Sequence, residues 1–166
     1  MSPGACRGVK ARLSGLLTFE VSYEMVMQLN VFAENKPGKL EKITGILADA
    51  NVNIKALKIS SENGYGVFQF IVDNPEAAFR AFKQAGITVS QKDVLAVVVD
   101  DKPGSLHHML GLLREDGIDV ADCYGFVVER EEKAIIVLEV SNLTAARRIL
   151  ERQNYNVIGS SELYSL

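Results

Sequence analysis

The strongest constraint on the fold of this chain is an internal duplication. Residues 35–57 (NKPGKLEKITGILADANVNIKAL) align with residues 101–123 (DKPGSLHHMLGLLREDGIDVADC) at an offset of 66, and six of the 23 aligned positions are identical. About one or two identities would be expected by chance, because each residue type makes up roughly 5 to 8% of an average protein. The match resumes between residues 72–78 and 140–146 at a slightly larger offset. The repeat therefore predicts that one supersecondary unit is built twice.

The first copy predicts six elements of secondary structure. Apolar and polar residues alternate over 27–33, as in a half-buried strand, and apolar residues recur at helical spacing from Leu40 to Ala50. Asn63-Gly64 lies between two apolar runs, which is a strong hairpin signal, and Asn74-Pro75 is typical of a capped helix start. The predicted order is a strand at 27–33, a helix at 40–50, a strand from 52, a hairpin at 63–64, a strand at 67–72, a helix at 75–85 and a strand from 87.

The second copy repeats this order. It predicts strands at 95–99, 118–121, 134–140 and 157–159, a charged turn at 129–133, and helices at 103–115 and after Asn142. The fold class is therefore predicted to be α+β, with two ferredoxin-like βαββαβ units in tandem, each an antiparallel sheet with helices on one face. Only residues 90–93 separate the copies, so the last strand of the first is expected to run almost directly into the second.

These patterns divide the chain into a tail and two domains. Residues 1–25 show no useful periodicity and are expected to form a disordered tail, while the two domains are expected at 26–92 and 93–166. Basic residues precede a short apolar stretch in the tail, but Ser14-Gly15 interrupts it. A secretion signal is therefore not expected.

Composition argues against several classes of function. The net charge is −3, from 18 Lys+Arg and 21 Asp+Glu, which predicts no nucleic-acid partner. Cys6 and Cys123 lie 117 positions apart with no second sulfur near either, so we expect no disulfide framework. This cysteine usage fits a reducing compartment, and we therefore expect a cytoplasmic location. The longest apolar run, residues 94–99, is far shorter than the roughly 18 residues of a membrane span.

Residues with catalytic or ligating chemistry form no recognisable constellation. Phe68 and Phe70 share a strand face but lie among apolar residues, which favours core packing over RNA stacking. His107 and His108 are adjacent on a helix and point about 100° apart, so they cannot chelate one ion together. Asp100-Asp101 fits a solvated loop edge better than a catalytic pair. We therefore expect no catalytic residue, no metal and no cofactor.

The duplicated turn is the one feature that suggests binding. Residues 35–40 (NKPGKL) and 101–106 (DKPGSL) each join a strand to a helix, and backbone N–H groups at a helix start lack internal partners. Such groups suit a carboxylate, and Gly38 or Gly104 allows a ligand to lie against the backbone. The side chain of Asn35 or Asp101 could accept a hydrogen bond from an ammonium group. A free amino acid combines both groups. Pro-Gly could also serve only to turn the chain, but its recurrence in both copies favours a shared use.

These turns, with Asn51-Val52-Asn53-Ile54 and their second-copy partners, resemble ACT domains over residues 26–166. ACT domains are small regulatory modules that commonly bind amino acids where two units meet, the first turn of one facing the second strand of the other. The resemblance implies a ligand-binding set of Asn35, Pro37, Gly38, Lys39, Leu40, Asn53 and Ile54 in the first copy, and Asp101, Pro103, Gly104, Ser105, Leu106, Asp119 and Val120 in the second.

The two copies depart from the family pattern in different ways. A histidine sometimes found two residues before the turn Asn is Ala33 in the first copy and Val99 in the second. Asp119 stands where the first copy has Asn53, and its negative charge would repel a ligand carboxylate. We therefore expect the two sites to differ in affinity or orientation, or only one to be used.

The resemblance to stand-alone tandem ACT proteins implies an amino-acid-binding regulatory protein. It would form a homodimer or higher homo-oligomer and modulate a separate enzyme of amino-acid metabolism. The alternative is a ligand-independent structural or oligomerisation module that braces a partner enzyme. An enzyme acting on a small acid is the third interpretation.

Overall fold

The computed structural model describes residues 24–62, 64–128 and 132–165. Most of the expected tail, residues 1–23, lies outside the described residues, and so do Asn63 of the predicted hairpin and residues 129–131 of the predicted charged turn. The strands on either side of the first hairpin pair up to Glu62 and Tyr65, which leaves the two-residue connection that Asn-Gly predicts.

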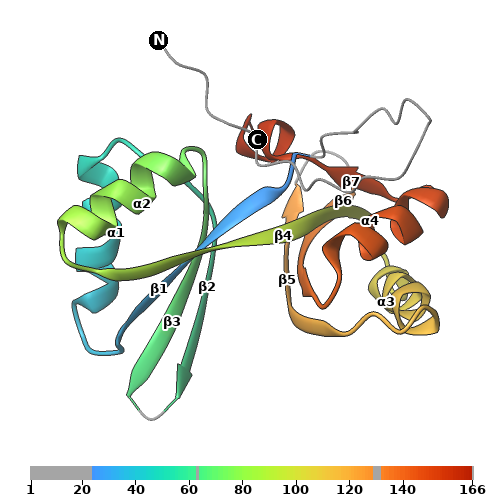
Figure 1. Ribbon diagram of the computed structural model, residues 1–166, viewed down its shortest axis with the longest axis horizontal. Helices are drawn as coiled ribbons and strands as arrows, with labels where there is room; N and C mark the ends of the chain where they lie inside the picture. Colours follow the sequence, from blue (N-terminus) through green and yellow to red (C-terminus); the bar gives the residue numbers. More distant parts are fainter. Residues whose placement is uncertain (1–23, 63, 129–131, 166) are drawn as a thin grey trace, which may run out of the picture.

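The described elements follow the predicted order in both copies, and a short C-terminal helix is added (Figure 1). The first unit contains β1 (Val26–Glu34), α1 (Lys39–Asp49), β2 (Ile54–Glu62), β3 (Tyr65–Val72), α2 (Pro75–Gln84) and β4 (Thr88–Asp100). From β4 the second unit continues with α3 (Ser105–Glu115), β5 (Val120–Val128), β6 (Lys133–Val140), α4 (Leu143–Arg152) and β7 (Asn156–Ile158), and α5 (Ser160–Ser165) follows. The two predicted βαββαβ units are confirmed.

Strand β4 belongs to both units. Residues 88–94 pair antiparallel with β1, residues 95–100 pair with β6, and residues 96–98 also pair with β7. One sheet therefore runs through the molecule in the order β2-β3-β1-β4-β6-β5, with β7 beside β4. Figure 1 shows β4 as one ribbon that passes from the first unit into the second. The predicted connection at residues 90–93 is thus part of this strand, as its shortness indicates.

The helices of each unit cover one face of its part of the sheet. In the first unit Leu29, Phe68 and Phe70 point toward α1 and α2, and the rings of Phe70 and Phe82 lie 6.1 Å apart. In the second unit the equivalent core contains Met109 and Leu113 of α3 and Leu138 of β6. Asn74 and Asn142 cap α2 and α4, which confirms the predicted capping at residue 74.

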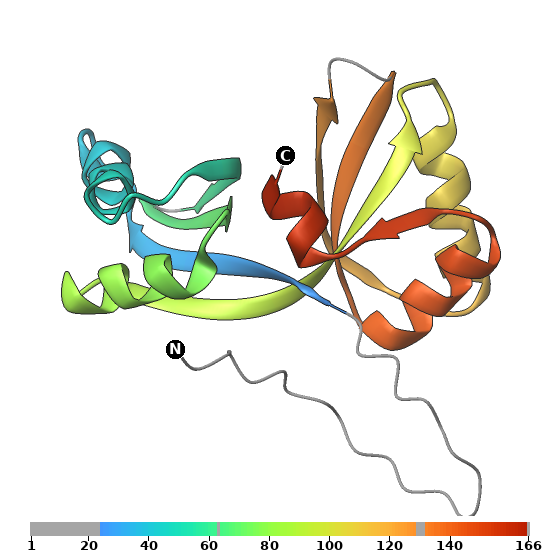
Figure 2. The ribbon, with the colours of Figure 1, turned by 90° about the horizontal axis from the view of Figure 1, so that it is seen from above.

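A third core joins the two units. The sheet face opposite the helices, called here the open face, turns inward in both units, and α5 lies between the two halves (Figure 2). The Tyr164 hydroxyl accepts a hydrogen bond from the Met27 backbone N–H at 2.9 Å, so α5 is fastened to β1. The buried members of this core are Val26, Ile71, Val94, Ala96, Ile135, Val137, Ile158 and Leu163.

The packing of α5 predicts that its one buried leucine stabilises the whole molecule. Leu163 is completely buried in the third core, so Leu163→Ala is expected to lower the free energy of unfolding by about 2–5 kcal/mol. Urea denaturation measures this loss. Glu162→Ala, on the exposed side of the same helix, should stay within about 0.5 kcal/mol of the unsubstituted protein. Equal losses for the two variants would contradict the packing of α5 into the core.

Candidate functional site

The two predicted turns have the same backbone conformation. Each strand ends, passes through Pro-Gly, and enters a helix at Lys39 or Ser105. Gly38 and Gly104 stand immediately before these helices with φ values of 80° and 93°, in the left-handed region that glycine adopts without steric cost. The glycines therefore permit the sharp entry into α1 and α3.

The starts of α1 and α3 lack the caps that α2 and α4 have. Asn142 accepts a hydrogen bond from the Ala145 N–H at 3.0 Å, whereas glycine at the start of α1 and α3 has no side chain to do so. The Ser105 N–H donates to the Lys102 carbonyl at 3.2 Å, and the Lys39 N–H donates to that of Lys36. Within the part of the chain that the structure describes, the next two amides of each helix have no acceptor; they belong to Leu40, Glu41, Leu106 and His107.

A polar cavity of about 640 Å³ adjoins the second turn. Gly104 and Ser105 line it, whereas Asp101, Pro103 and Leu106 of the predicted set do not. This volume is within the usual range for small-molecule sites. The rest of its lining comes from the end of β4, from α3, and from segments around β6 and β7: Val98, Val99, Asp100, His108, Lys133, Asn154, Tyr155 and Asn156.

Charged and aromatic side chains give this cavity its chemistry. The Lys133 Nζ lies 2.5 Å from Asp100 Oδ1. This hydrogen bond, with the positive charges of Lys133 and Lys102, lowers the pKa of Asp100, so the carboxylate is ionised at neutral pH. His108 Nδ1 lies 2.8 Å from the Tyr155 hydroxyl. Burial, and secondarily the charge of Asp100, raises the pKa of Tyr155, so the phenol keeps its proton.

None of these four side chains belongs to the site that the sequence predicts. From the sequence, Asp100 fits a loop edge, and His108 is one of two adjacent helix histidines that point apart, which is typical of solvated helix residues. The exposure of His108 agrees with that interpretation, but its contact with Tyr155 adds a cavity wall. Lys133 and Tyr155 carry no local motif and come near the turn only through the fold. A signal was available at His108 alone, since it lies one helical turn after Gly104.

The first turn differs in its surroundings. Asn35, Pro37 and Gly38 are exposed, and Lys39 and Leu40 are half-buried. A second hollow of about 540 Å³ lies nearby on the open face of the first unit, but none of the predicted residues lines it. Its lining is largely apolar and consists of Phe32, Ala33, Ser60, Ser61, Glu62, Tyr65, Gly66 and Val67.

The predicted strand-start residues lie at the other end of each sheet. The Asn35 N–H donates to Gly64 beside the β2–β3 hairpin, whereas Asn53 is joined to Asp73 at the far end of the same strands. Likewise, Asp119 is joined to Ser141, away from the second turn. Ile54 and Val120, next in sequence, pack partly against the helix-side cores.

The two turns lie at opposite ends of the molecule, because β1 and β4 are antiparallel (Figure 1). Among the described residues, no hydrogen bond joins the first turn to Asp119 or Val120, or the second turn to Asn53 or Ile54. A single chain therefore does not bring the turn and strand-start residues together.

Two further observations concern the described residues alone. Residues 24–62, 64–128 and 132–165 contain no group of three or more His, Cys, Asp or Glu side chains that could hold a metal ion. None of the helices described is long and apolar enough to cross a membrane.

Several solved structures share the fold of this chain. The crystal structure of protein BT0572 from Bacteroides thetaiotaomicron is similar to this chain with a TM-score of 0.82 and 30% identity, over 87% of this chain and 99% of that one. The regulatory subunit of aspartate kinase from Thermus thermophilus has the same fold, with a TM-score of 0.60 and 14% identity over 78% and 93% of the two chains. The crystal structure of aspartokinase α and β subunits also has this fold, with a TM-score of 0.56 and 22% identity over 76% of this chain and 90% of that one.

The comparison of sequences gives the family. No curated protein matches the sequence significantly. Residues 24–166 match the family model described as an ACT domain pair, which covers both βαββαβ units and α5. The chain therefore belongs to the ACT domain family, as a pair of ACT domains.

Proposed function

We propose that this protein is an amino-acid-binding regulatory protein whose ligand lies beside the second turn. ACT domains are regulatory rather than catalytic modules, and this proposal gives the chain no catalytic role. The observation that carries the proposal is that the uncapped start of α3 borders a polar cavity, through Gly104, Ser105 and His108.

The cavity and the start of α3 beside it together offer a partner for each charged group of a free amino acid. The backbone N–H groups of Leu106 and His107 are without acceptors in the described structure and would receive the α-carboxylate. The ionised carboxylate of Asp100 would receive the α-ammonium group. The ligand side chain would then lie toward the wall formed by His108 and Tyr155, whose rings are stacked 6.3 Å apart.

The proposal differs between the two copies. The first turn has the same free amides, but none of its residues lines either the polar cavity or the apolar hollow formed by the described residues, so the second turn is the primary site. A site between ACT units would also use Asn53 or Asp119, and these residues reach a turn only if another copy of the chain supplies them. We therefore include a homodimer or higher homo-oligomer, in the cytoplasm, that acts on a separate enzyme of amino-acid metabolism.

One observation favours the structural alternative. On the open face of the first unit, Phe32 is 45% exposed and Tyr65 is 68% exposed beside the apolar hollow. Exposed apolar patches of this kind mark contact surfaces in soluble proteins. A ligand-independent module that braces a partner would use such a surface.

Ligand binding is tested by thermal denaturation of the full chain with each common amino acid at millimolar concentration. A ligand present at 100 times its Kd should add about 2.7 kcal/mol to the free energy of unfolding. At least one amino acid is expected to raise the unfolding temperature. No shift with any of them would favour the structural module, and turnover of a small acid would favour an enzyme.

The choice between the turns is tested by the matched variants Gly104→Asn and Gly38→Asn. Asparagine tolerates a left-handed backbone, and a Cβ at either position meets no atom within 4 Å, so each variant should lose only about 1 kcal/mol of stability. Isothermal titration calorimetry is carried out with the amino acid that raises the unfolding temperature. Its Kd should rise at least tenfold in Gly104→Asn and stay unchanged in Gly38→Asn. The reverse pattern would place the site at the first turn.

A further inference from the structure

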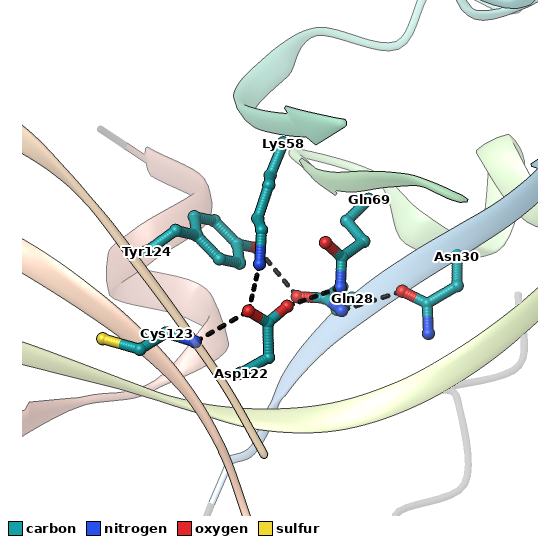
Figure 3. Close-up of polar contacts among 7 residues, drawn as sticks. All are labelled: Gln28, Asn30, Lys58, Gln69, Asp122, Cys123 and Tyr124. Atoms are coloured by element: carbon teal, nitrogen blue, oxygen red, sulfur yellow. Dashed lines mark hydrogen bonds and ion pairs between the residues drawn. The ribbon is translucent and has the colours of Figure 1, made fainter. Parts of the chain in front are cut away.

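One polar cluster interrupts the apolar contact between the two open faces. Asp122 on β5 is its centre (Figure 3). Its Oδ1 accepts hydrogen bonds from Lys58 Nζ on β2 and from the Cys123 N–H, and its Oδ2 accepts one from Gln69 Nε2 on β3 at 2.7 Å. The side chains of Lys58 and Asp122 are only 29% and 18% exposed, so this ion pair is largely shielded from water.

A second chain of hydrogen bonds lies beside the ion pair. The Tyr124 hydroxyl on β5 donates to Gln28 Oε1 on β1, and Gln28 Nε2 donates to Asn30 Oδ1, both at 2.8 Å. Lys58 Nζ also lies 5.7 Å from the centre of the Tyr124 ring. All the bonds from Lys58, Gln69 and Tyr124 cross from one unit to the other (Figure 3).

The side-chain amide of Gln69 is held in a single orientation within the cluster. Its amide Nε2 bonds to Asp122, but its Oε1 is buried and has no partner among the described atoms. Rotating the amide would place this oxygen against the Asp122 carboxylate. The amide is therefore held in one orientation by Asp122, at the cost of one unsatisfied acceptor.

Comparison of the repeats shows that the two units contribute different side chains to the cluster from equivalent positions. Both copies have a bulge at the equivalent step of the second strand, between Ile54 and Ala56 and between Val120 and Asp122, which fixes the alignment. Four polar residues that the first unit contributes to the cluster are replaced by apolar or aromatic residues in the second unit. The acidic residue that the second unit contributes is replaced by alanine in the first unit. The equivalent pairs are Gln28 and Val94, Asn30 and Ala96, Lys58 and Tyr124, Gln69 and Val137, and Ala56 and Asp122.

This divergence makes the two open faces complementary to each other and not to themselves. Two first-unit faces would bring together lysines without a carboxylate, and two second-unit faces would bury Asp122 without a cation. Burying an unpaired charge is strongly unfavourable, so such contacts are selected against. The ion pair and the hydrogen bonds of the cluster form only when a first-unit face packs against a second-unit face.

We propose that Lys58, Gln69 and Asp122 form an orientation lock, which selects one mutual arrangement of the two ACT units while the surrounding apolar core supplies the stability. Burial of Asp122 tends to raise its pKa, but the hydrogen bonds from Lys58 and Gln69 outweigh this, so the pKa is lowered and the acid is ionised at neutral pH. Replacing a buried ion pair by apolar residues often preserves stability, so orientation and stability can be separated by experiment.

The test measures both quantities in four versions of the full chain. They are the unsubstituted protein, Lys58→Met, Asp122→Leu and the double variant, each with spin labels at Lys42→Cys on α1 and Arg148→Cys on α4 and with Cys6 and Cys123 changed to serine. Urea denaturation gives the unfolding midpoint, and double electron–electron resonance gives the distribution of distances between the units. Both label positions are exposed.

The single variants are expected to lower the unfolding midpoint, because each leaves one partner buried and unpaired. The double variant should recover most of the decrease in unfolding midpoint that the single variants show. Its distribution of distances between the units should still be broader than that of the unsubstituted protein. A double variant with an equally narrow distribution would overturn the proposal, because the apolar core alone would then set the orientation.

A charge exchange keeps the proposal testable if a single variant does not fold. Lys58→Asp combined with Asp122→Lys restores the ion pair with its charges exchanged. The distribution of distances between the spin labels should then be narrower than in the double apolar variant. A distribution as broad as in that variant would count against the lock. Glu76→Gln removes an exposed ion pair with Arg80 within α2 and should change neither midpoint nor distribution.

Discussion

The architecture depends on the hydrogen-bonded continuity of β4. A single strand of 13 residues completes the sheet of the first unit and begins that of the second. Because side chains alternate along a strand, Val89, Leu95 and Val97 face the helices while Val94 and Ala96 face inward. One additional residue within β4 would reverse this alternation in the second unit. The strand therefore fixes which faces of the two units meet, and the third core follows.

The sequence was sufficient to predict the two units but not how they pack. Strand and helix periodicities are local, and the repeat confirmed each one against its copy. The strands predicted from 52 and at 118–121 begin two residues later, at Ile54 and Val120, and the second one continues to Val128, well beyond its predicted end. Helix α5 was missed because six residues with a single buried leucine carry no clear period. Its position depends on the packed core between the open faces, which no local pattern describes.

The candidate site shows the same limit. The repeated Pro-Gly turn predicted free amides at two helix starts, and both are present. The sequence could not distinguish them, because the cavity walls come from elsewhere. Where the second copy has His108 and Tyr155, the first has Lys42 and Ile87, so the hydrogen-bonded wall exists once. The polar cluster around the lock had a weaker signal: Gln28 and Asn30 lie on the same face of their strand as the apolar residues Val26 and Phe32.

The proposed site and the lock lie on different strands of one continuous sheet, and β5, which carries Asp122, pairs with β6, which carries Lys133. This sheet offers a physical route between them. β4 runs from Val94 in the third core to Asp100 at the cavity, and β6 runs from Lys133 at the cavity to Val137 in that core. The Asp100–Lys133 ion pair therefore closes the cavity end of two paired strands whose other parts pack against the first unit. A ligand that competes for this pair would act on the same sheet that carries the contacts between the units. Couplings of about 1–3 kcal/mol are typical between such sites, and the lock provides the discrete contact that a coupling of this size could favour or oppose.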